Sequence, residues 1–387
     1  MVKVLLLGCG TIGSIITRVL NEMPEVSEVL VADREYERTR EYVESLGSEK
    51  LSVARVDVRD VDACAELMKE ADVVCNATWY LFNLYVMRAA IKAKRDMLDL
   101  GGLYHMTLEQ LKLDDEVKEA GITTVIGCGS DPGLSNVMAR YCADKLDEVE
   151  GIHIRYGGIG GGAFYFAIPT IINEFTMEAV VFRDGKYVRL PPLSEKEIVE
   201  FPEPVGKQTT YCIIHSELAT LPKTIKGVKN VDYKDSWGEE TINVLKVLKE
   251  YGFLSEEPVE VEGVKVAPRS LVIKLLSRAI PKVTPGSVDV LRVIAKGVKD
   301  GLKTTITCDA IVRWGGKCVE WNVSTSNYIT AVPAAVGTLL LGRGEVKEKG
   351  VVPPEVAFDA GKFLEMVSEW GVEIYEKVEQ IKPVGKS

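Results

Sequence analysis

Three glycines near the N-terminus are spaced so that bare backbone would face a bound ligand. Gly8, Gly10 and Gly13 follow an apolar run at residues 2–7 and open a second apolar segment. In such a pattern the first glycine permits a tight turn, the second lets phosphates approach the backbone, and the third lets a helix pack closely on a strand. Asp33, twenty residues after Gly13, is placed to accept hydrogen bonds from ribose hydroxyls. The spacing therefore predicts a dinucleotide-binding site.

Neighbouring residues extend the expected contacts along the dinucleotide. Thr11 and Ile12 lie at the predicted start of the first helix, where backbone N–H groups and the helix dipole attract phosphates. Thr78, just past the fourth predicted strand, is expected to line the nicotinamide ribose and the pyrophosphate.

Charged residues after the second and third predicted strands bear on the choice of coenzyme. Asp33 would repel the 2′-phosphate of NADP and so favours NAD, whereas Arg34 could stack on adenine or grip that phosphate. Asp57 either contacts the adenine amino group or caps a turn. These charged residues thus predict NAD as the coenzyme and leave NADP as an alternative.

The elements that must position these residues alternate regularly in the first third of the chain. Apolar runs typical of buried strands alternate with segments of helical periodicity, which predicts a parallel, doubly wound α/β sheet. The predicted strands are 2–7, 29–33, 51–57, 72–76, 96–100 and 123–127, and the predicted helices are 11–20, 34–46, 61–69, 81–93 and 108–120.

The pattern changes to strands and hairpins after about residue 130. Residues 182–188 predict a hairpin turning at Asp-Gly, 210–215 and 259–266 predict strands, and 288–296 with 303–314 predict a long antiparallel pair. Residues 152–167 predict a strand, a glycine bend and a second strand. We therefore expect a second, α+β domain with a largely antiparallel sheet.

The bulk composition argues against several kinds of partner. There are 47 basic and 57 acidic residues, and the net charge of −10 disfavours binding to nucleic acid or to an anionic membrane. No run approaches the ~18–20 apolar residues that cross a bilayer. The eight cysteines are scattered without a CxxC pair, and there are only three histidines. This pattern predicts free thiols in a reducing cytoplasm and no metal site.

Several longer segments resemble one known family. They are DPGLSN at 131–136, RYGGIGGG at 155–162, PTIINEFTMEAVVFRDGK at 169–186, HSELATLP at 215–222 and VPAAVGTLLLGRGEVKEKGVVPPE at 332–355. Together with the glycine motif, and in this order, they resemble the saccharopine dehydrogenase and lysine 6-dehydrogenase group of oxidoreductases over nearly the whole chain.

The resemblance implies a domain division and an assembly. The chain would re-enter the nucleotide domain after the substrate domain, which gives a dinucleotide-binding domain at 1–130 and 328–387 and a substrate-binding and dimerisation domain at 131–327. It also implies a homodimer or a dimer of dimers, and pyridine-nucleotide chemistry at a carbon that bears nitrogen, with a lysine-derived amino acid or an amine as substrate.

Amine oxidation by hydride transfer needs a group that takes the ammonium proton, and a histidine suits that task. His215, within HSELATLP, is the first candidate, and a satisfied strand-end histidine is the alternative. Asp131, in the bend after the sixth predicted strand, would project near the nicotinamide or simply cap a helix. Tyr104, beside His105, could orient the substrate or relay a proton.

Other residues could hold the substrate. Asp131, Glu174 and Glu217 could bind a cationic amine, and Trp237 could form an apolar or cation–π wall or belong to the core. A substrate carboxylate would need a basic partner such as Arg313, although spacing does not distinguish it from Arg155 or Arg183.

Three functions remain open at this point. The resemblance favours an NAD(P)-dependent amine dehydrogenase most like lysine 6-dehydrogenase, because AIPTIINEF (residues 167–175) stands where saccharopine reductases carry a tryptophan-serine stretch. The first alternative is a saccharopine- or carboxyspermidine-forming reductase. The second is a non-catalytic NAD-binding sensor or scaffold.

Overall fold

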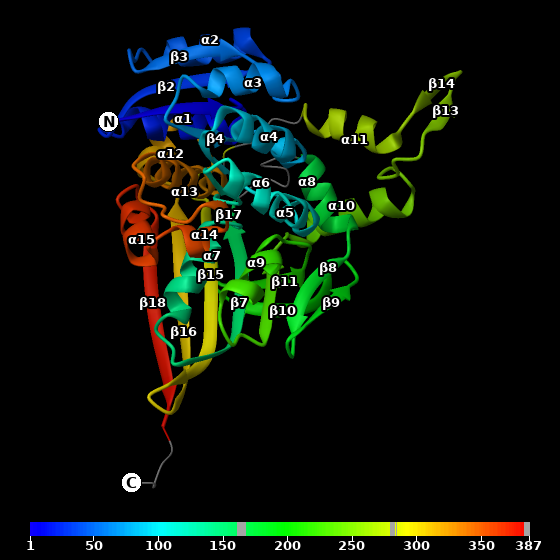
Figure 1. Ribbon diagram of the computed structural model, residues 1–387. Helices are drawn as coiled ribbons and strands as arrows, with labels where there is room; N and C mark the ends of the chain where they lie inside the picture. Colours follow the sequence, from blue (N-terminus) through cyan, green and yellow to red (C-terminus); the bar gives the residue numbers. More distant parts are fainter. Residues whose placement is uncertain (161–167, 279–282, 284, 383–387) are drawn as a thin grey trace.

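Two large β-sheets joined by shared helices make up most of the molecule, and a small two-stranded sheet lies apart from them (Figure 1). The computed structural model describes residues 1–160, 168–278, 283 and 285–382. The first sheet is entirely parallel, and its strands lie in the order β3 (Leu51–Arg55), β2 (Val26–Asp33), β1 (Val2–Leu7), β4 (Val73–Asn76), β5 (Asp96–Asp99), β6 (Thr123–Val125) and β17 (Gly350–Val352).

This strand order confirms the predicted doubly wound sheet. The helices along this part of the chain are α1 (Thr11–Glu22), α2 (Tyr36–Ser45), α3 (Val61–Met68), the 3₁₀ turn η1 (Tyr80–Phe82), α4 (Asn83–Ala93), α5 (Tyr104–Leu111) and α6 (Asp114–Glu119). The single helix expected at 108–120 is wrong, because two helices, α5 and α6, occupy this region and the first begins at Tyr104.

Alternation along β1 explains why helices cover both faces of this sheet. Val4 and Leu6 belong to a core shared with α1, whereas Leu5 and Leu7 belong to a second core that includes residues of α3 and α4. Successive side chains of a strand point to opposite faces, so an uninterrupted apolar run requires cover on both sides.

The second sheet is mixed. Its strands lie in the order β10 (Ser194–Glu200), β11 (Lys207–Cys212), β12 (Asn230–Asp235), β7 (Glu148–Ile159), β15 (Val288–Lys299), β16 (Leu302–Arg313) and β18 (Glu373–Ile381), with β8 (Ala179–Arg183) and β9 (Lys186–Leu190) beside β12. Only β12 and β7 pair in parallel among the described strands of this sheet, which confirms the largely antiparallel character expected of the second domain.

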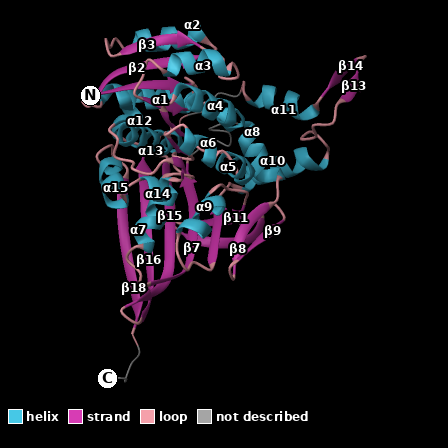
Figure 2. Cartoon of the chain, viewed as in Figure 1, coloured by secondary structure: helices cyan, strands magenta, loops and turns pink. Residues whose placement is uncertain are grey.

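The remaining helices lie between and beside the sheets (Figure 2). They are α7 (Leu134–Ala143), α8 (Ile168–Thr176), α9 (Glu217–Thr224), α10 (Glu239–Glu250), α11 (Pro268–Leu276), α12 (Gly316–Trp321), α13 (Thr325–Gly342), α14 (Pro354–Ala357) and α15 (Ala360–Ser368). The hairpin predicted at 182–188 is present as β8 and β9, with Asp184 and Gly185 at positive φ in its turn.

Two further expectations differ from the structure or lie outside it. The strand expected at 259–266 is a small hairpin of β13 (Val259–Val261) and β14 (Val264–Val266), because Glu262 and Gly263 take positive φ and reverse the chain. The second strand expected after the glycine bend, near 163–167, lies outside the described residues.

The C-terminal segment is shared between the two sheets. Helix α13 packs on α1 and on β4 and β5, and β17 extends the first sheet. Strand β18, however, pairs with β16 in the second sheet, although the sequence-based division grouped 328–387 with the first. Residues of α7, α13 and both sheets belong to one continuous core, so the two sheets are held in a fixed relation. No described helix is long and apolar enough to span a bilayer.

A substitution at Gly13 tests how closely β1 and the turn after it pack against α1. A Cβ at this position would lie 2.0 Å from the Gly8 carbonyl oxygen, whereas a Cβ at Gly10 would meet no atom within 4 Å. We expect Gly13→Ala to lower the free energy of unfolding by about 1–3 kcal/mol, because the clash with fixed backbone exceeds the gain in helix propensity. Gly10→Ala is the matched control in urea denaturation, and equal stability of the two variants would contradict this packing.

Candidate active site

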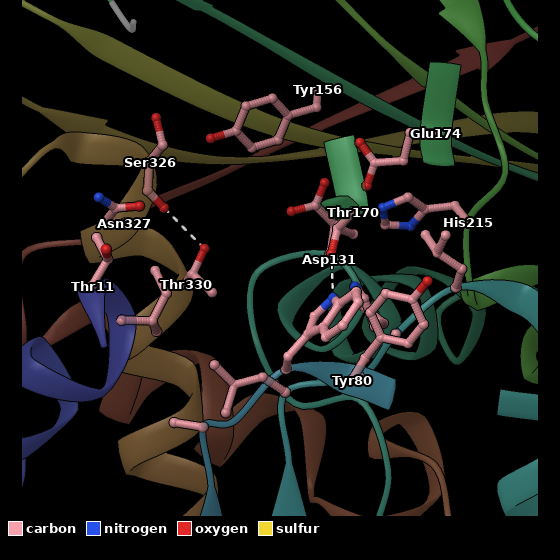
Figure 3. A pocket seen from close by; sticks show the side chains of 18 of the residues that line it. Thr11, Tyr80, Asp131, Tyr156, Thr170, Glu174, His215, Ser326, Asn327 and Thr330 are labelled. Carbon is pink, nitrogen blue, oxygen red and sulfur yellow. Dashed lines mark hydrogen bonds between the residues drawn. The ribbon is translucent and has the colours of Figure 1, made fainter. Parts of the chain in front are cut away.

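A cavity of about 370 Å³ lies where the carboxyl ends of β1, β4 and β5 face the second sheet (Figure 3). Ligands of open parallel sheets bind at this edge, beside the point where the strand order reverses. The cavity is lined by residues from both domains: Gly10, Thr11, Ile12, Ala77, Thr78, Trp79, Tyr80, Leu100, Gly101, Gly102, Leu103, Asp131, Pro132, Tyr156, Thr170, Glu174, His215, Tyr233, Asp235, Ser326, Asn327 and Thr330.

A second cavity, of about 300 Å³, adjoins the first at Gly10 and Thr78. Its walls include Gly8, Asp33, Arg34 and Asp57, so the residues expected at the adenosine end lie together here. The open space beside Gly10, where an added Cβ would meet nothing within 4 Å, is room for phosphates at the α1 N-terminus. The two cavities therefore fit an extended dinucleotide that crosses the glycine motif.

Asp33 holds the glycine turn as well as facing the second cavity. One of its carboxylate oxygens accepts a hydrogen bond from the Cys9 N–H at 2.7 Å, and the other accepts from the Glu35 N–H at 2.9 Å. Each oxygen keeps a further lone pair, so ribose hydroxyls can still be bound. The Arg38 guanidinium, which the sequence analysis did not single out, donates to the Cys9 carbonyl at 2.9 Å and adds a second arginine to this cavity.

His215 is held in one orientation by a buried carboxylate. Its Nδ1 pairs with Glu217, which is fully buried and also accepts a hydrogen bond from the Ser135 hydroxyl at 2.7 Å. This leaves Nε2 as the ring atom that can face a ligand. Burial alone would lower the pKa of His215, but Glu217, Asp131 and Glu174 outweigh it and raise the pKa to about 9. The ring is therefore an imidazolium at neutral pH.

Tyr233 connects His215 to Asp131. The phenol ring stacks on the imidazole with the ring centroids 3.7 Å apart and the planes 6° from parallel, and its hydroxyl donates to the Asp131 carboxylate. Burial raises the pKa of Asp131 to about 6, against the lowering effects of His215 and of the Tyr233 hydrogen bond. A single buried tyrosine thus positions two ionisable groups of the cavity.

Glu174 and Asp235 contribute two more carboxyl groups to the side of the cavity that holds Asp131 and His215. Figure 3 shows Glu174 beside His215 and Asp131, across the cavity from Thr11, Asn327 and Thr330. Burial raises the pKa of Glu174 to about 8, and burial raises that of Asp235 well above its usual range. Within the described part of the chain, no hydrogen bond or ion pair joins the Glu174 carboxyl group to another residue. This carboxyl group is therefore available to a cationic ligand.

Four of the expected site residues do not line the cavity. Glu217 lies behind His215, and Tyr104 contacts the Tyr187 ring instead. Trp237 packs on Phe175 in a buried cluster.

Arg313 is the last residue of β16, does not line the cavity, and pairs with Glu373 at 3.4 Å. It does not supply the basic partner that a substrate carboxylate was expected to need. Among the described residues that line the cavity there is no lysine or arginine.

Sequence reasoning missed several lining residues, among them Tyr156, Tyr233, Asp235 and Asn327. Tyr156 and Asp235 are paired across the parallel strands β7 and β12. The alternation of Val231, Tyr233 and Asp235 along 230–235 was a signal for this strand and for the shared face of these side chains.

A substitution at Asp33 tests whether this residue lies at the adenosine ribose of the coenzyme. Asp33→Ala removes the negative charge that opposes a 2′-phosphate, so we expect the ratio of NADP to NAD affinity to rise by about tenfold, or ~1.4 kcal/mol. Fluorescence titration with both coenzymes measures the ratio. Asp57→Ala is the matched control, since Asp57 lines the same cavity but is engaged by Arg59. An unchanged ratio in Asp33→Ala would remove Asp33 from the ribose.

Tyr233→Phe tests the link between the two ionisable groups. The variant keeps the ring that stacks on His215 but loses the hydrogen bond that stabilises ionised Asp131, so the pKa of Asp131 should rise. We expect the acidic limb of the kcat/KM profile to move to higher pH by about one unit. Tyr328→Phe, at a buried tyrosine that donates to the Trp370 carbonyl, is the control for stability. Equal profiles for both variants would contradict the positioning role.

Comparisons with known proteins agree with this geometry. Residues 4–125 match the saccharopine dehydrogenase NADP-binding domain, and residues 129–372 match the saccharopine dehydrogenase C-terminal domain. The chain is 28% identical to carboxyaminopropylagmatine dehydrogenase of Synechocystis over 98% of both chains, and 24% identical to carboxynorspermidine synthase of Vibrio alginolyticus over 98% of this chain and 97% of that one.

A solved structure shows the same fold. Saccharopine dehydrogenase (L-Glu forming) of Saccharomyces cerevisiae superimposes with a TM-score of 0.73 at 18% identity, covering 98% of this chain and all of that one. The two family matches together span most of the chain, one on the coenzyme side of the cavity and one on the acidic side. The protein is a member of the saccharopine dehydrogenase family of NAD(P)-dependent oxidoreductases.

Proposed function

We propose that this oxidoreductase joins a carbonyl compound to a cationic amine by reduction, forming a secondary amine. The observation that carries the proposal is a set of three carboxyl groups, the buried Glu174 and Asp235 and the partly buried Asp131, around a cavity whose described lining lacks lysine and arginine. Such a wall favours a ligand with positive charge and disfavours an anionic one. An amine with a second cationic group suits it better than an amino acid held mainly by its carboxylate.

The names of the relatives support the reductive alternative over lysine 6-dehydrogenase. One relative is named for carboxyaminopropylagmatine and another for carboxynorspermidine. A carboxyaminopropyl group results when aspartate semialdehyde is condensed with an amine and the imine is reduced. We extend that substrate class, an amino-acid aldehyde with a diamine or a guanidino-amine, to this chain.

The residues have distinct tasks in this reaction. When bound, the coenzyme supplies the hydride. Once ionised, Asp131 and Glu174 hold the ammonium groups. The Glu174 carboxylate accepts the proton that one ammonium nitrogen loses before that nitrogen attacks the carbonyl carbon. His215, as an imidazolium, gives a proton to the departing hydroxyl group, so that water leaves and the C=N bond forms. Glu217 fixes the ring while the proton moves.

Coenzyme choice remains part of the proposal. Asp33 favours NAD, as the sequence predicted, while Arg34 and Arg38 on the same cavity can bind a 2′-phosphate. We propose that both coenzymes bind and that Asp33 sets their ratio. A cytoplasmic location and a homodimer or dimer of dimers stay predictions.

The reaction is tested with purified protein by following reduced-coenzyme absorbance. We expect NADH or NADPH to be consumed only when aspartate semialdehyde is present together with an amine such as agmatine or diaminopropane. His215→Gln should lower turnover by about 100-fold or more while coenzyme affinity is retained. Faster reduction of NAD with lysine alone would restore the lysine 6-dehydrogenase assignment, and tight coenzyme binding without turnover of any amine would favour a sensor.

A further inference from the structure

The first turn of α13 lines the main cavity and carries a buried side chain that has no partner. Ser326, Asn327 and Thr330 face the cavity from this helix. The Asn327 N–H donates to the Ser324 hydroxyl at 3.2 Å, but within the described part of the chain no hydrogen bond reaches its side-chain Oδ1. Asn327 is only 6% exposed. Buried polar atoms of native proteins usually have a hydrogen-bond partner, so the Asn327 side chain points to a ligand.

Hydrogen bonds from two strands of the second sheet fix this turn. Asp289, on β15, accepts from the hydroxyl groups of Thr325 and Ser326, the latter at 3.1 Å. The Tyr156 hydroxyl, on β7, donates to the same carboxyl group at 2.9 Å. The backbone that carries Asn327 is therefore held in place, while its side-chain amide remains available.

The position of Asn327 assigns it to the coenzyme side of the cavity. Figure 3 shows it with Thr11 and Thr330, across the cavity from Asp131. Helix α13 packs on α1, β4 and β5, whose ends form the coenzyme side. An extended dinucleotide with its adenosine end in the second cavity, beyond Gly10, would bring its nicotinamide end into this part of the main cavity.

The chemistry of the turn favours a neutral group over an anion. Among the described residues that line the cavity there is no lysine or arginine, and the turn is already hydrogen-bonded to the Asp289 carboxyl group. A phosphate or a carboxylate would find no positively charged side chain here. The Asn327 side chain offers an acceptor in Oδ1 and donors on Nδ2. A carboxamide offers the same two kinds of group in return.

We propose that Asn327 binds the carboxamide group of the nicotinamide ring, with Oδ1 accepting a hydrogen bond from the carboxamide N–H. This contact fixes the rotation of the ring and so decides which of its faces is open to the side of the cavity that holds Asp131 and Glu174. Asn327 is thus the residue that orients the reactive end of the coenzyme. The inference rests on the coenzyme of the family and not on the substrates proposed above.

Coenzyme analogues test this contact in the full-length protein by calorimetric titration. The three probes are NADH, its acetylpyridine analogue, in which a methyl group replaces the carboxamide NH₂, and ADP-ribose, which lacks the nicotinamide ring but keeps both phosphates and the ribose. Wild type should bind NADH roughly five- to tenfold more tightly than the analogue. Asn327→Ala should remove this preference by weakening NADH binding, and should leave the affinities for the analogue and ADP-ribose within about twofold of wild type.

The control substitution is Thr338→Val, because Thr338 is a buried polar residue of the same helix that does not line the cavity. It should keep the wild-type preference for NADH. Asn327→Ala breaks no side-chain hydrogen bond among the described residues, so its fold should be retained, and ADP-ribose binding reports on that. An unchanged preference for NADH in Asn327→Ala would overturn the proposal. Equal weakening of all three probes would also overturn it, because Asn327 would then act on the ribose or on the fold.

Discussion

On the side of the cavity formed by the second domain, carboxyl groups outnumber positively charged groups. Asp131, Glu174, Asp235 and Glu217 surround one imidazolium, that of His215. Charge of one sign is expensive to bury without a partner, so the pKa values of Asp131, Glu174 and Asp235 are raised. An amine with more than one positive charge would relieve this imbalance, and the proposed substrate class rests on that.

The fold brings this acidic wall to the coenzyme through a few fixed elements. The glycine turn after β1 and the loops after β4 and β5 form one side of the cavity, and β7, β12 and α8 of the second domain form the other. Helix α13 returns from the second domain to pack on α1, and its first residues line the cavity. Because a continuous core joins these parts, the residues on the two sides of the cavity are held in a defined geometry.

Local signals in the sequence predicted most of the first domain and part of the site. Alternating strands and helices, the Gly8 to Gly13 spacing and Asp33 lie close together along the chain, so periodicity and turn chemistry suffice to find them. Tyr233 and Asp235 were missed because their place depends on β12 pairing with β7, about eighty residues earlier.

Side-chain direction accounts for other differences between expectation and structure. Trp237 and Tyr104 lie beside segments that line the cavity, but their rings contact Phe175 and Tyr187. The Arg313 side chain, at the end of β16, pairs with Glu373 instead of entering the cavity. The sequence did not indicate that β18 belongs to the second sheet. Its pairing with β16 depends on tertiary contacts and not on the residues of β18 alone.

Proton release on amine binding tests the central claim most directly. Calorimetric titration of a diamine in two buffers of different ionisation enthalpy counts the protons released. Near neutral pH the account predicts release of about one proton per amine, because Glu174 must ionise to pair with the ammonium group, and predicts loss of that release with weaker binding in Glu174→Gln. Binding of equal strength in both proteins, without proton release, would contradict it.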